Sequence, residues 1–427
     1  MPSFVTNNVP QVVLDFIAAN PQLITSIIVI LVVIHLCLGA AAYLILLERK
    51  VCAWTQDRIG PNRVGPMGLL QPLADGLKLF MKEDWIPKQA DKFLFVLAPG
   101  LTVMTALIGF AIIPWAGTLE IGGAAVNIIV ADVNIGIVYL LAVASMGVYG
   151  VALGGWASNS KFSFIGGMRA AAQMISYEIP MGLCLLCIVL LAGTVSPYGI
   201  IAAQTGAGNQ WFILHQPLVA IIFYTCMLAE ANRSPFDLAE AEAELVGGWH
   251  TEYSSMKWAM FFLGEYVGMV TTGAFFAVLF LGGWSLNPFG VGPDLAERGG
   301  IVLILVQFGV TLGKTFAIVF LTMLIRWTLP RFRFDQLMRL SWEGMIPASL
   351  LLLLITSFFV FMGWGEYMWA GSAAALVIIW LLGPLLPKQA NPNHKVPMIG
   401  SRFSPLKESD AISASGDMLA MSAAAER

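Results

Sequence analysis

The chain has 427 residues, of which 58% are hydrophobic and 11% are charged, and its formal net charge is −3. An average globular domain carries about a quarter charged residues, so this chain has too few to cover a soluble surface of its size. The composition therefore excludes a lone cytosolic enzyme and a disordered chain, and the near-neutral charge gives no electrostatic support for a nucleic-acid partner.

Nine apolar stretches are long enough to cross a bilayer, which takes about 20 residues of helix. The stretches are continuously apolar rather than alternating, so they predict helices and not barrel strands. The expected fold class is an all-α polytopic membrane protein with about nine transmembrane helices. The predicted spans are Leu23–Leu47, Phe93–Trp115, Ile135–Trp156, Met174–Leu191, Trp211–Leu228, Trp258–Gly282, Ile301–Ile325, Met345–Trp364 and Ala370–Leu386.

The basic residues predict the orientation. All 23 lysines and arginines except Arg298 and Lys314 fall on one side, in the connections after odd-numbered spans and in the C-terminal tail. Because basic loops stay in the cytoplasm, this side is predicted to be cytoplasmic, with the N-terminus outside. The expected regions are a periplasmic segment 1–22, a membrane domain 23–386 with cytoplasmic loops 48–92, 229–257 and 326–344, and a cytoplasmic tail 387–427.

The segment Glu48–Trp85, which follows the first span, combines charge with an amphipathic pattern. Polar side chains recur at spacings of four, three and four residues, with leucines and a phenylalanine largely opposite them. They are Gln71, Asp75, Lys78 and Lys82. The pattern predicts a helix lying in the membrane interface. It fits either a surface anchor or, together with Arg49 and Arg58, the mouth of a pocket for an amphipathic ligand.

The connection Glu230–Tyr253, with the sequence EANRSPFDLAEAEAELVGGWHTEY, is strongly acidic and has Arg233 as its one basic side chain. Its carboxylates are Glu230, Asp237, Glu240, Glu242, Glu244 and Glu252. A solvated acidic surface is the simpler interpretation. The apolar residues Leu238 and Leu245 between the carboxylates favour partial burial instead.

Three ionisable residues lie inside predicted spans: Glu178, Glu265 and Lys314. An unpaired charge at the bilayer centre costs at least about 2.5–3.5 kcal/mol, so such residues usually pair, change protonation or line a path. A structural glutamate–lysine ion pair is one interpretation. A proton relay that descends from the acidic connection is the preferred one.

The sequence contains no recognisable motif for a metal, a nucleotide or an iron–sulfur cluster. The five cysteines are an odd number within or beside apolar runs, which predicts neither a disulfide framework nor a metal site. Glycine-rich nucleotide motifs and cysteine arrays are missing from the sequence, so we expect this chain to bind no dinucleotide, ATP or iron–sulfur cluster. The N-terminal residues also lack the pattern of a removable signal peptide.

Several motifs resemble the H subunit of respiratory complex I, the family of mitochondrial NADH dehydrogenase subunit one. The strongest are QDRIGPNRVGPMGLLQPLADGLKLFMKED, ending at Asp84, and AEANRSPFDLAEAEAELVGGWHTEYSS at Ala229–Ser255. Further matches are RAAAQMISYEIP at Arg169–Pro180, FFLGEY at Phe261–Tyr266 and IRWTLPRFRFDQLM at Ile325–Met338.

The resemblance implies a subunit of proton-pumping NADH:quinone oxidoreductase in the inner (plasma) membrane, with an eight-helix core and one further C-terminal span. Quinone, either ubiquinone or menaquinone, is the implied substrate, and this chain alone holds no cofactor and no redox centre. The implied partners are the peripheral-arm subunits of the quinone site and terminal cluster, small membrane subunits and lipids. The membrane anchor of an energy-converting hydrogenase and, less closely, a cation/proton antiporter are the alternatives.

The resemblance also assigns candidate residues to two sites. The quinone-cavity candidates are Arg49, Arg58, Asp75, Lys78 and Phe236. The proton-relay candidates are Glu178, Glu230, Asp237, Glu240, Glu242, Glu244, Glu252, Glu265 and Lys314. Burial and like charge both favour protonated carboxyl groups, so we expect these acids to share protons.

Overall fold

The computed structural model describes residues 20–382, except 122–123, 207, 241, 292–293 and 296–297. The predicted tail 387–427, the end of the ninth span and nearly all of segment 1–22 therefore lie outside the described residues. The chain divides into two compact units, residues 1–377 and 378–427. The helical bundle and the cavities below belong to the first unit.

Within the described residues, seven helical segments are long and apolar enough to cross a membrane, which confirms the all-α polytopic fold class. Six of them are α3 (Pro21–Thr55), α5 (Lys92–Ile108, extended by a 3₁₀ turn to Ile112), α6 (Gly136–Ala157), α7 (Lys161–Ala192), α12 (Ser255–Phe280) and α13 (Ile301–Thr328). The seventh begins with α14 (Phe334–Arg339), passes through a π-helical turn and ends with α15 (Ile346–Phe361).

One predicted span is not a single helix. The continuous helix expected at Trp211–Leu228 is wrong: α9 (Phe212–His215) stops at Gln216, and α10 (Pro217–Glu230) starts afresh. Gln216 has φ −132° and ψ 64°, outside the helical region. A residue before proline is pushed out of that region, and Pro217 suits the first position of a new helix. The ninth span corresponds to α16 (Met368–Leu382) as far as the described residues reach.

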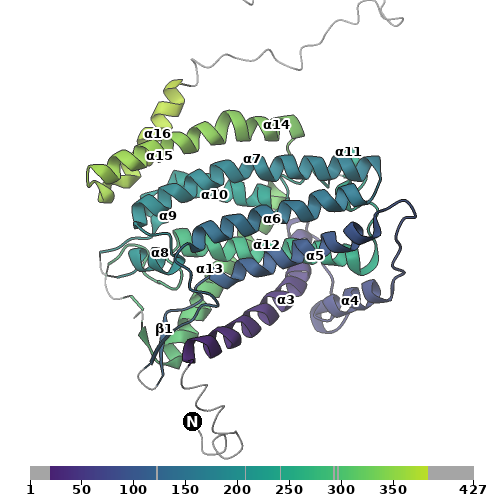
Figure 1. The fold of residues 1–427 in the computed structure, drawn as a ribbon, viewed down its shortest axis with the longest axis horizontal. Coiled ribbons are helices and arrows are strands. Elements are labelled where there is room, and N and C mark those ends of the chain that lie inside the picture. The colour runs from purple at the N-terminus through teal and green to yellow at the C-terminus, as the bar shows by residue number, and fades with distance from the viewer. Residues whose placement is uncertain are drawn as a thin grey trace, which may run out of the picture. The chain divides into compact units, whose positions relative to one another are not determined.

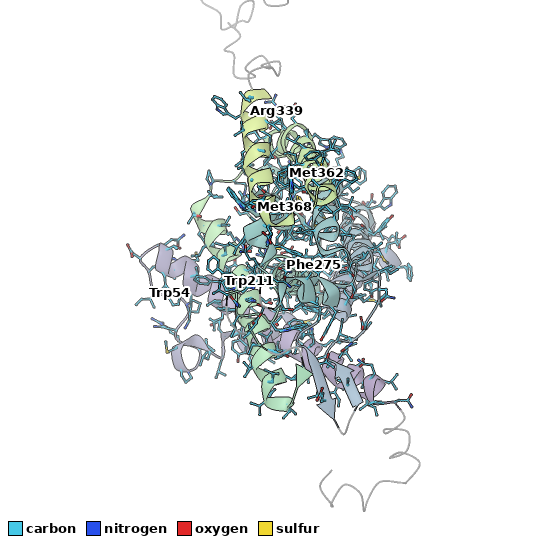
Figure 2. The ribbon with its side chains drawn as sticks, turned by 90° about the vertical axis from the view of Figure 1, so that its left-hand side faces the viewer. Trp54, Trp211, Phe275, Arg339, Met362 and Met368 are labelled. Carbon is cyan, nitrogen blue, oxygen red and sulfur yellow. The ribbon has the colours of Figure 1, made fainter. Side chains whose placement is uncertain are left out.

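The helix α12 is the centre of the bundle. It contacts α3, α5, α10 and α13, and the neighbouring helices α5, α6 and α7 lie side by side (Figure 1). Near its C-terminal end, Val278, Leu279 and Phe280 are completely buried. Figure 2 shows Phe275 of this helix within the bundle, whereas Trp54 lies at the end of α3. A helix that is apolar around most of its circumference is typically surrounded by other elements in this way.

One end of the bundle carries the connections that were predicted to lie outside. They form a small sheet of the antiparallel pair β1 (Thr118–Ile121) and β2 (Ala124–Asn127), with β3 (Arg298–Gly299) parallel to β1. These strands have no counterpart among the elements predicted from the sequence. Beside the sheet, α8 (Pro197–Gln204) is joined to it by a 2.9 Å hydrogen bond between the hydroxyls of Thr118 and Tyr198.

The opposite end gathers the three charged connections. The predicted amphipathic helix is confirmed as α4 (Gln71–Met81), and the acidic connection contains the short α11 (Glu242–Leu245). Lys257 at the start of α12 forms a 2.6 Å ion pair with Asp84 in the connection after α4. On α4, Leu73, Leu77 and Phe80 are 63%, 63% and 74% exposed, as expected of a helix that turns an apolar face outward. Which end faces the cytoplasm stays a prediction.

Candidate functional site

Two cavities lie near the charged end of the bundle, and α12 lines both of them. The first, here called the arginine cavity, has a volume of about 350 Å³ and is lined by the ends of α3 and α13, by the loop after α3 and by α12. The second, the inner cavity, has a volume of about 140 Å³ and lies among α5, α6, α7, α10 and α12. Consecutive residues of α12 belong to different cavities, because Tyr266 lines the arginine cavity and Glu265 the inner one.

The arginine cavity combines three guanidinium groups with one buried carboxylate. Arg49, Arg58 and Arg326 line it, together with Glu48, which is only 7% exposed. Glu48 accepts hydrogen bonds from Arg326 and from the Tyr266 hydroxyl, the latter at 2.5 Å. A buried carboxylate held by several charge-assisted hydrogen bonds is well compensated, so this corner of the cavity is fixed in geometry.

Arg233 connects this corner to the inner carboxylates. Its side chain is buried, with Nη1 3.7 Å from Glu48 and Nη2 3.4 Å from Glu265. The guanidinium carbon lies 4.4 Å from the centroid of the Tyr266 ring, a cation–π distance. One fixed positive charge is thus shared by two carboxylates that border different cavities.

The predicted carboxylates Asp237 and Glu240 lie beside this arginine. Burial raises the pKa of Asp237 to about 6, although the nearby positive charges of Arg331 and Arg326 act in the opposite direction. Arg331 donates a 3.1 Å hydrogen bond to Asp237. Burial also raises the pKa of Glu240, and a hydrogen bond with Glu265 offsets part of that rise. Both groups therefore hold protons more tightly than exposed carboxylates do.

The remaining carboxylates of the cluster continue into the bundle. Glu265 and Glu230 both line the inner cavity, whose other walls are mostly apolar. Glu230 also borders a smaller cavity of about 10 Å³ on its other side, which it shares with Glu178. Glu178 in turn accepts a hydrogen bond from Ser145 on α6. Pairwise contacts and shared cavity linings thus connect the carboxylates in the order Asp237, Glu240, Glu265, Glu230 and Glu178.

Of the four other relay candidates, three belong to the acidic connection. Glu244 forms a 2.6 Å ion pair with Arg169 of α7, and its side chain is 40% exposed. Glu252 lies in the same connection outside the linings of the three cavities, and the side chain of Glu242 lies outside the described residues.

Lys314 of α13 is the fourth candidate, and its side chain lies beside the C-terminal end of α12. Its ammonium group donates to the carbonyl oxygens of Leu281, Gly283 and Ser285 at 2.5, 2.8 and 2.5 Å. It also stands 4.1 Å from the centroid of the Trp211 ring. Leu281 is sixteen residues beyond Glu265, about 24 Å along a helix. The described residues therefore do not contain the glutamate–lysine pair that was one interpretation of the sequence.

Some of the quinone-cavity candidates lie at the arginine cavity and others do not. Arg49 and Arg58 line the arginine cavity, and Asp75 on α4 binds Arg49 at 2.8 Å. Lys78 is exposed on α4 and does not line that cavity. Phe236 is buried elsewhere, with its ring 5.5 Å from that of Phe332 and 5.6 Å from that of Tyr177.

Sequence reasoning missed the residues that join the two cavities, namely Glu48, Arg233, Tyr266 and Arg326. One signal was available, because Arg233 is the single cation among six carboxylates and had to be shared between them. Glu48 and Arg326 are far apart in sequence and lie in different helices, α3 and α13, so neither spacing nor composition relates them.

Metal binding has no support in the described part of the chain. It contains no group of three or more histidine, cysteine or acidic side chains placed to hold a metal ion. Its five cysteines are all free and buried.

Comparison with known proteins gives consistent relatives. Residues 27–357 match the model of a family described as NADH dehydrogenase. An H subunit of NADH-quinone oxidoreductase from Cytophaga hutchinsonii is 47% identical over 346 residues, which cover 81% of this chain and 98% of the relative. One from Geobacter metallireducens is 49% identical, covering 75% and 91%. The H subunit from Flavobacterium johnsoniae is 45% identical, covering 78% and 94%.

Proposed function

We propose that this chain, which belongs to the NADH dehydrogenase family and is a membrane subunit of NADH-quinone oxidoreductase, forms part of the quinone path and couples quinone reduction to proton movement. The observation that carries the proposal is the position of Arg233 between Glu48 and Glu265. The Arg233 guanidinium contacts one lining residue of each cavity, Glu48 of the arginine cavity and Glu265 of the inner cavity.

The arginine cavity has the properties expected of a quinone path. A quinone has a long apolar tail and a small polar head, so its path needs an apolar approach with a few fixed polar groups. The cavity lies where the apolar helices α3, α12 and α13 meet the charged connections, and Phe262 and Trp327 line it beside the arginines. Its volume of about 350 Å³ falls within the usual range for ligand sites, about 300–1,000 Å³.

The carboxylate series supplies the proton side of the proposal. Reduction of a quinone to a quinol takes up two electrons and two protons, and a reduced quinone that awaits its protons is anionic. Negative charge near Arg49, Arg58 and Arg326 changes the electrostatic potential at Arg233, because charges a few ångströms apart interact strongly away from bulk water. Carboxyl groups with raised pKa values, such as Asp237 and Glu240, respond to such a change by binding or releasing protons.

The proposed direction of transfer runs inward along the carboxylate series. Protons pass from Asp237 and Glu240 through Glu265 and Glu230 to Glu178, and then sideways towards neighbouring membrane subunits. The proposal omits Lys314, because its ammonium group is bound to three carbonyl groups at the far end of α12. It also omits Glu244, whose charge is balanced by Arg169.

Electron transfer belongs to partner subunits in this proposal. The peripheral-arm subunits that bring a terminal iron–sulfur cluster to the quinone are expected to dock on the charged end, where the loops 48–92, 229–257 and 326–344 converge. The exposed apolar face of α4 then lies on the membrane surface beside the quinone entrance.

Photo-crosslinking tests the path directly. An azido-quinone added to the assembled complex should label peptides from the ends of α3 and α13 and from Phe262–Tyr266, and excess unlabelled quinone should abolish that labelling. Peptides of the sheet end, such as β1, provide the internal control. Labelling of β1 with none at the arginine cavity would contradict the proposed path.

A further inference from the structure

Trp249 borders the inner cavity, and its indole N–H has no acceptor among the described residues. The side chain is 1% exposed, and it shares the lining with Glu230, Glu265 and Asn232. A buried N–H group without a partner costs free energy, and native structures rarely leave one unsatisfied. Because Trp249 lies on a cavity wall, a water molecule in the cavity can accept a hydrogen bond from this N–H group.

The backbone around Trp249 explains why the side chain reaches so far inward. Gly248 has φ +61°, and a Cβ atom there would lie 1.9 Å from the carbonyl oxygen of Ala239. On α7, a Cβ atom at Gly166 would lie 2.5 Å from the backbone nitrogen of Trp249. The two glycines let the connection lie directly on the helix, so the indole enters the bundle against Phe261, at a ring distance of 4.3 Å.

The inner cavity can hold ordered water. Its volume of about 140 Å³ greatly exceeds the roughly 10–15 Å³ that one water molecule needs. A buried water also needs two to four polar partners, and most of this lining is apolar. The lining includes four threonines, Thr102, Thr105, Thr271 and Thr272, but their hydroxyls already donate to backbone carbonyl oxygens. Water is therefore expected near the remaining polar groups, which are Trp249, Asn232 and the two carboxylates.

We propose that Trp249 is a positioning residue that holds a water molecule between Glu265 and Glu230, an inference that rests on the proposed proton relay. An indole N–H can donate a hydrogen bond but cannot accept a proton, so Trp249 does not itself carry protons. Its hydrogen bond occupies one lone pair of the water and leaves both O–H groups free to point at the carboxylates. The relay then crosses the inner cavity through an oriented water.

Trp249→Phe tests this role, because it keeps a buried ring and removes only the N–H donor. Trp284→Phe is the matched control: Trp284 is also 1% exposed and its N–H also lacks an acceptor among the described residues, but it lines none of the three cavities. In proteoliposomes of the whole complex, we expect Trp249→Phe to lower quinone reduction and pH-gradient formation together by about three- to tenfold, the effect of one neutral hydrogen bond. NADH:ferricyanide activity should stay unchanged in both variants.

A spectroscopic readout separates this role from simple packing. The infrared difference between the wild-type and Trp249→Phe complexes should contain an O–H stretching band of a bound water that moves to lower wavenumber when H₂¹⁶O is replaced by H₂¹⁸O. Absence of such an isotope-sensitive water band would mean that the indole donates elsewhere, for example to the ring of Phe261, and would overturn the inference. Wild-type coupled turnover of Trp249→Phe would overturn it as well.

A second variant covers the case in which Trp249→Phe does not assemble. Gly268 also lines the inner cavity, and a Cβ atom there meets no atom within 4 Å, so Gly268→Ala adds a methyl group without a clash. We expect it to displace water and lower coupled turnover, and wild-type turnover would then overturn the inference. If Glu265→Gln and Glu230→Gln also retain wild-type turnover, the relay itself fails. If Glu265→Gln and Glu230→Gln lose coupled turnover while Trp249→Phe and Gly268→Ala retain it, only the role of Trp249 is wrong.

Discussion

Tyr266 of α12 donates a 2.5 Å hydrogen bond to the carboxylate of Glu48 near the end of α3. The same tyrosine ring lies against the guanidinium of Arg233, whose Nη2 atom is 3.4 Å from Glu265. Tyr266, at the wall of the arginine cavity, is therefore connected to Glu265 of the inner cavity through one intervening side chain, that of Arg233. In the proposed function, this arrangement makes the charge state of one cavity sensitive to a charge change in the other.

Tyr266→Phe is expected to weaken the connection between the two cavities, while the phenylalanine ring fills the space of the tyrosine ring. The ring that lies on Arg233 remains, whereas Glu48 loses its hydroxyl donor, and a hydrogen bond to a charged group contributes about 1.5–3 kcal/mol. We predict that NADH:quinone turnover falls by about tenfold while NADH:ferricyanide activity is retained. Tyr43→Phe, at a tyrosine of α3 that is 51% exposed, is the control and should behave as wild type. Equal rates in the two variants would show that the Tyr266–Glu48 bond has no functional role.

Arg58→Ala tests the polar lining of the arginine cavity. The Arg58 guanidinium donates to Gln56 at 2.8 Å and has no carboxylate within ion-pair distance in the described part of the chain, so it is available to a ligand. We predict that the KM for quinone rises by about tenfold in an assembled complex, as expected when one charge-assisted contact is lost. Arg63→Ala, in the same loop but away from the cavity lining, should leave the KM unchanged. An unchanged KM in Arg58→Ala would remove this residue from the quinone path.

Asp237 provides a pH-dependent prediction. Its pKa is raised by burial to about 6, so its contribution to stability is present while the group is protonated and is lost as the pH rises through that value. Asp237→Asn removes the titration. We therefore predict that the variant gains stability relative to wild type when the pH goes from about one unit below that pKa to one unit above it.

The temperature at which the complex loses this subunit on a native gel measures that effect. Asp335→Asn, at an aspartate whose side chain is 66% exposed, is the control and should show no such gain. If the difference between Asp237→Asn and wild type were the same at both pH values, the group would not titrate in this range.

Much of the fold follows from the sequence, because apolar length and period leave few choices for a chain in a bilayer. Seven of the nine predicted spans correspond to helices of sufficient length. The amphipathic helix α4 follows from the spacing of Gln71, Asp75 and Lys78. The break at Gln216 was missed because hydropathy alone does not register the backbone restriction that Pro217 imposes.

The candidate site was predictable only in part. The carboxylates were visible as an excess of negative charge, but their grouping depends on which helices are neighbours. The ion pairs of Glu48 with Arg233 and Arg326 join residues that are far apart in the sequence, and no local pattern encodes them. The partners of Lys314 could not be predicted for the same reason, since its carbonyl acceptors belong to the turn after another helix.

The orientation in the membrane has its own test. We predict that single cysteines placed at Arg63 and Arg333, both in connections of the charged end, react with an impermeant thiol reagent only in inverted vesicles. The basis is the concentration of basic residues at this end. A cysteine at Glu120 in β1 is the control for the opposite face and should react in intact cells. Labelling of the Arg63 site from outside intact cells would reverse the assigned topology.

The coupling of the two cavities through Glu265 is tested most directly by Glu265→Gln in proteoliposomes of the assembled complex. Quinone reduction and pH-gradient formation are measured in the same vesicles, and Glu252→Gln, at a carboxylate outside the three cavity linings, is the control. We predict that both rates fall together by about tenfold or more in Glu265→Gln, because removal of a proton-transfer group slows the steps that depend on it. Wild-type rates of both processes in the assembled Glu265→Gln complex would contradict the proposed coupling.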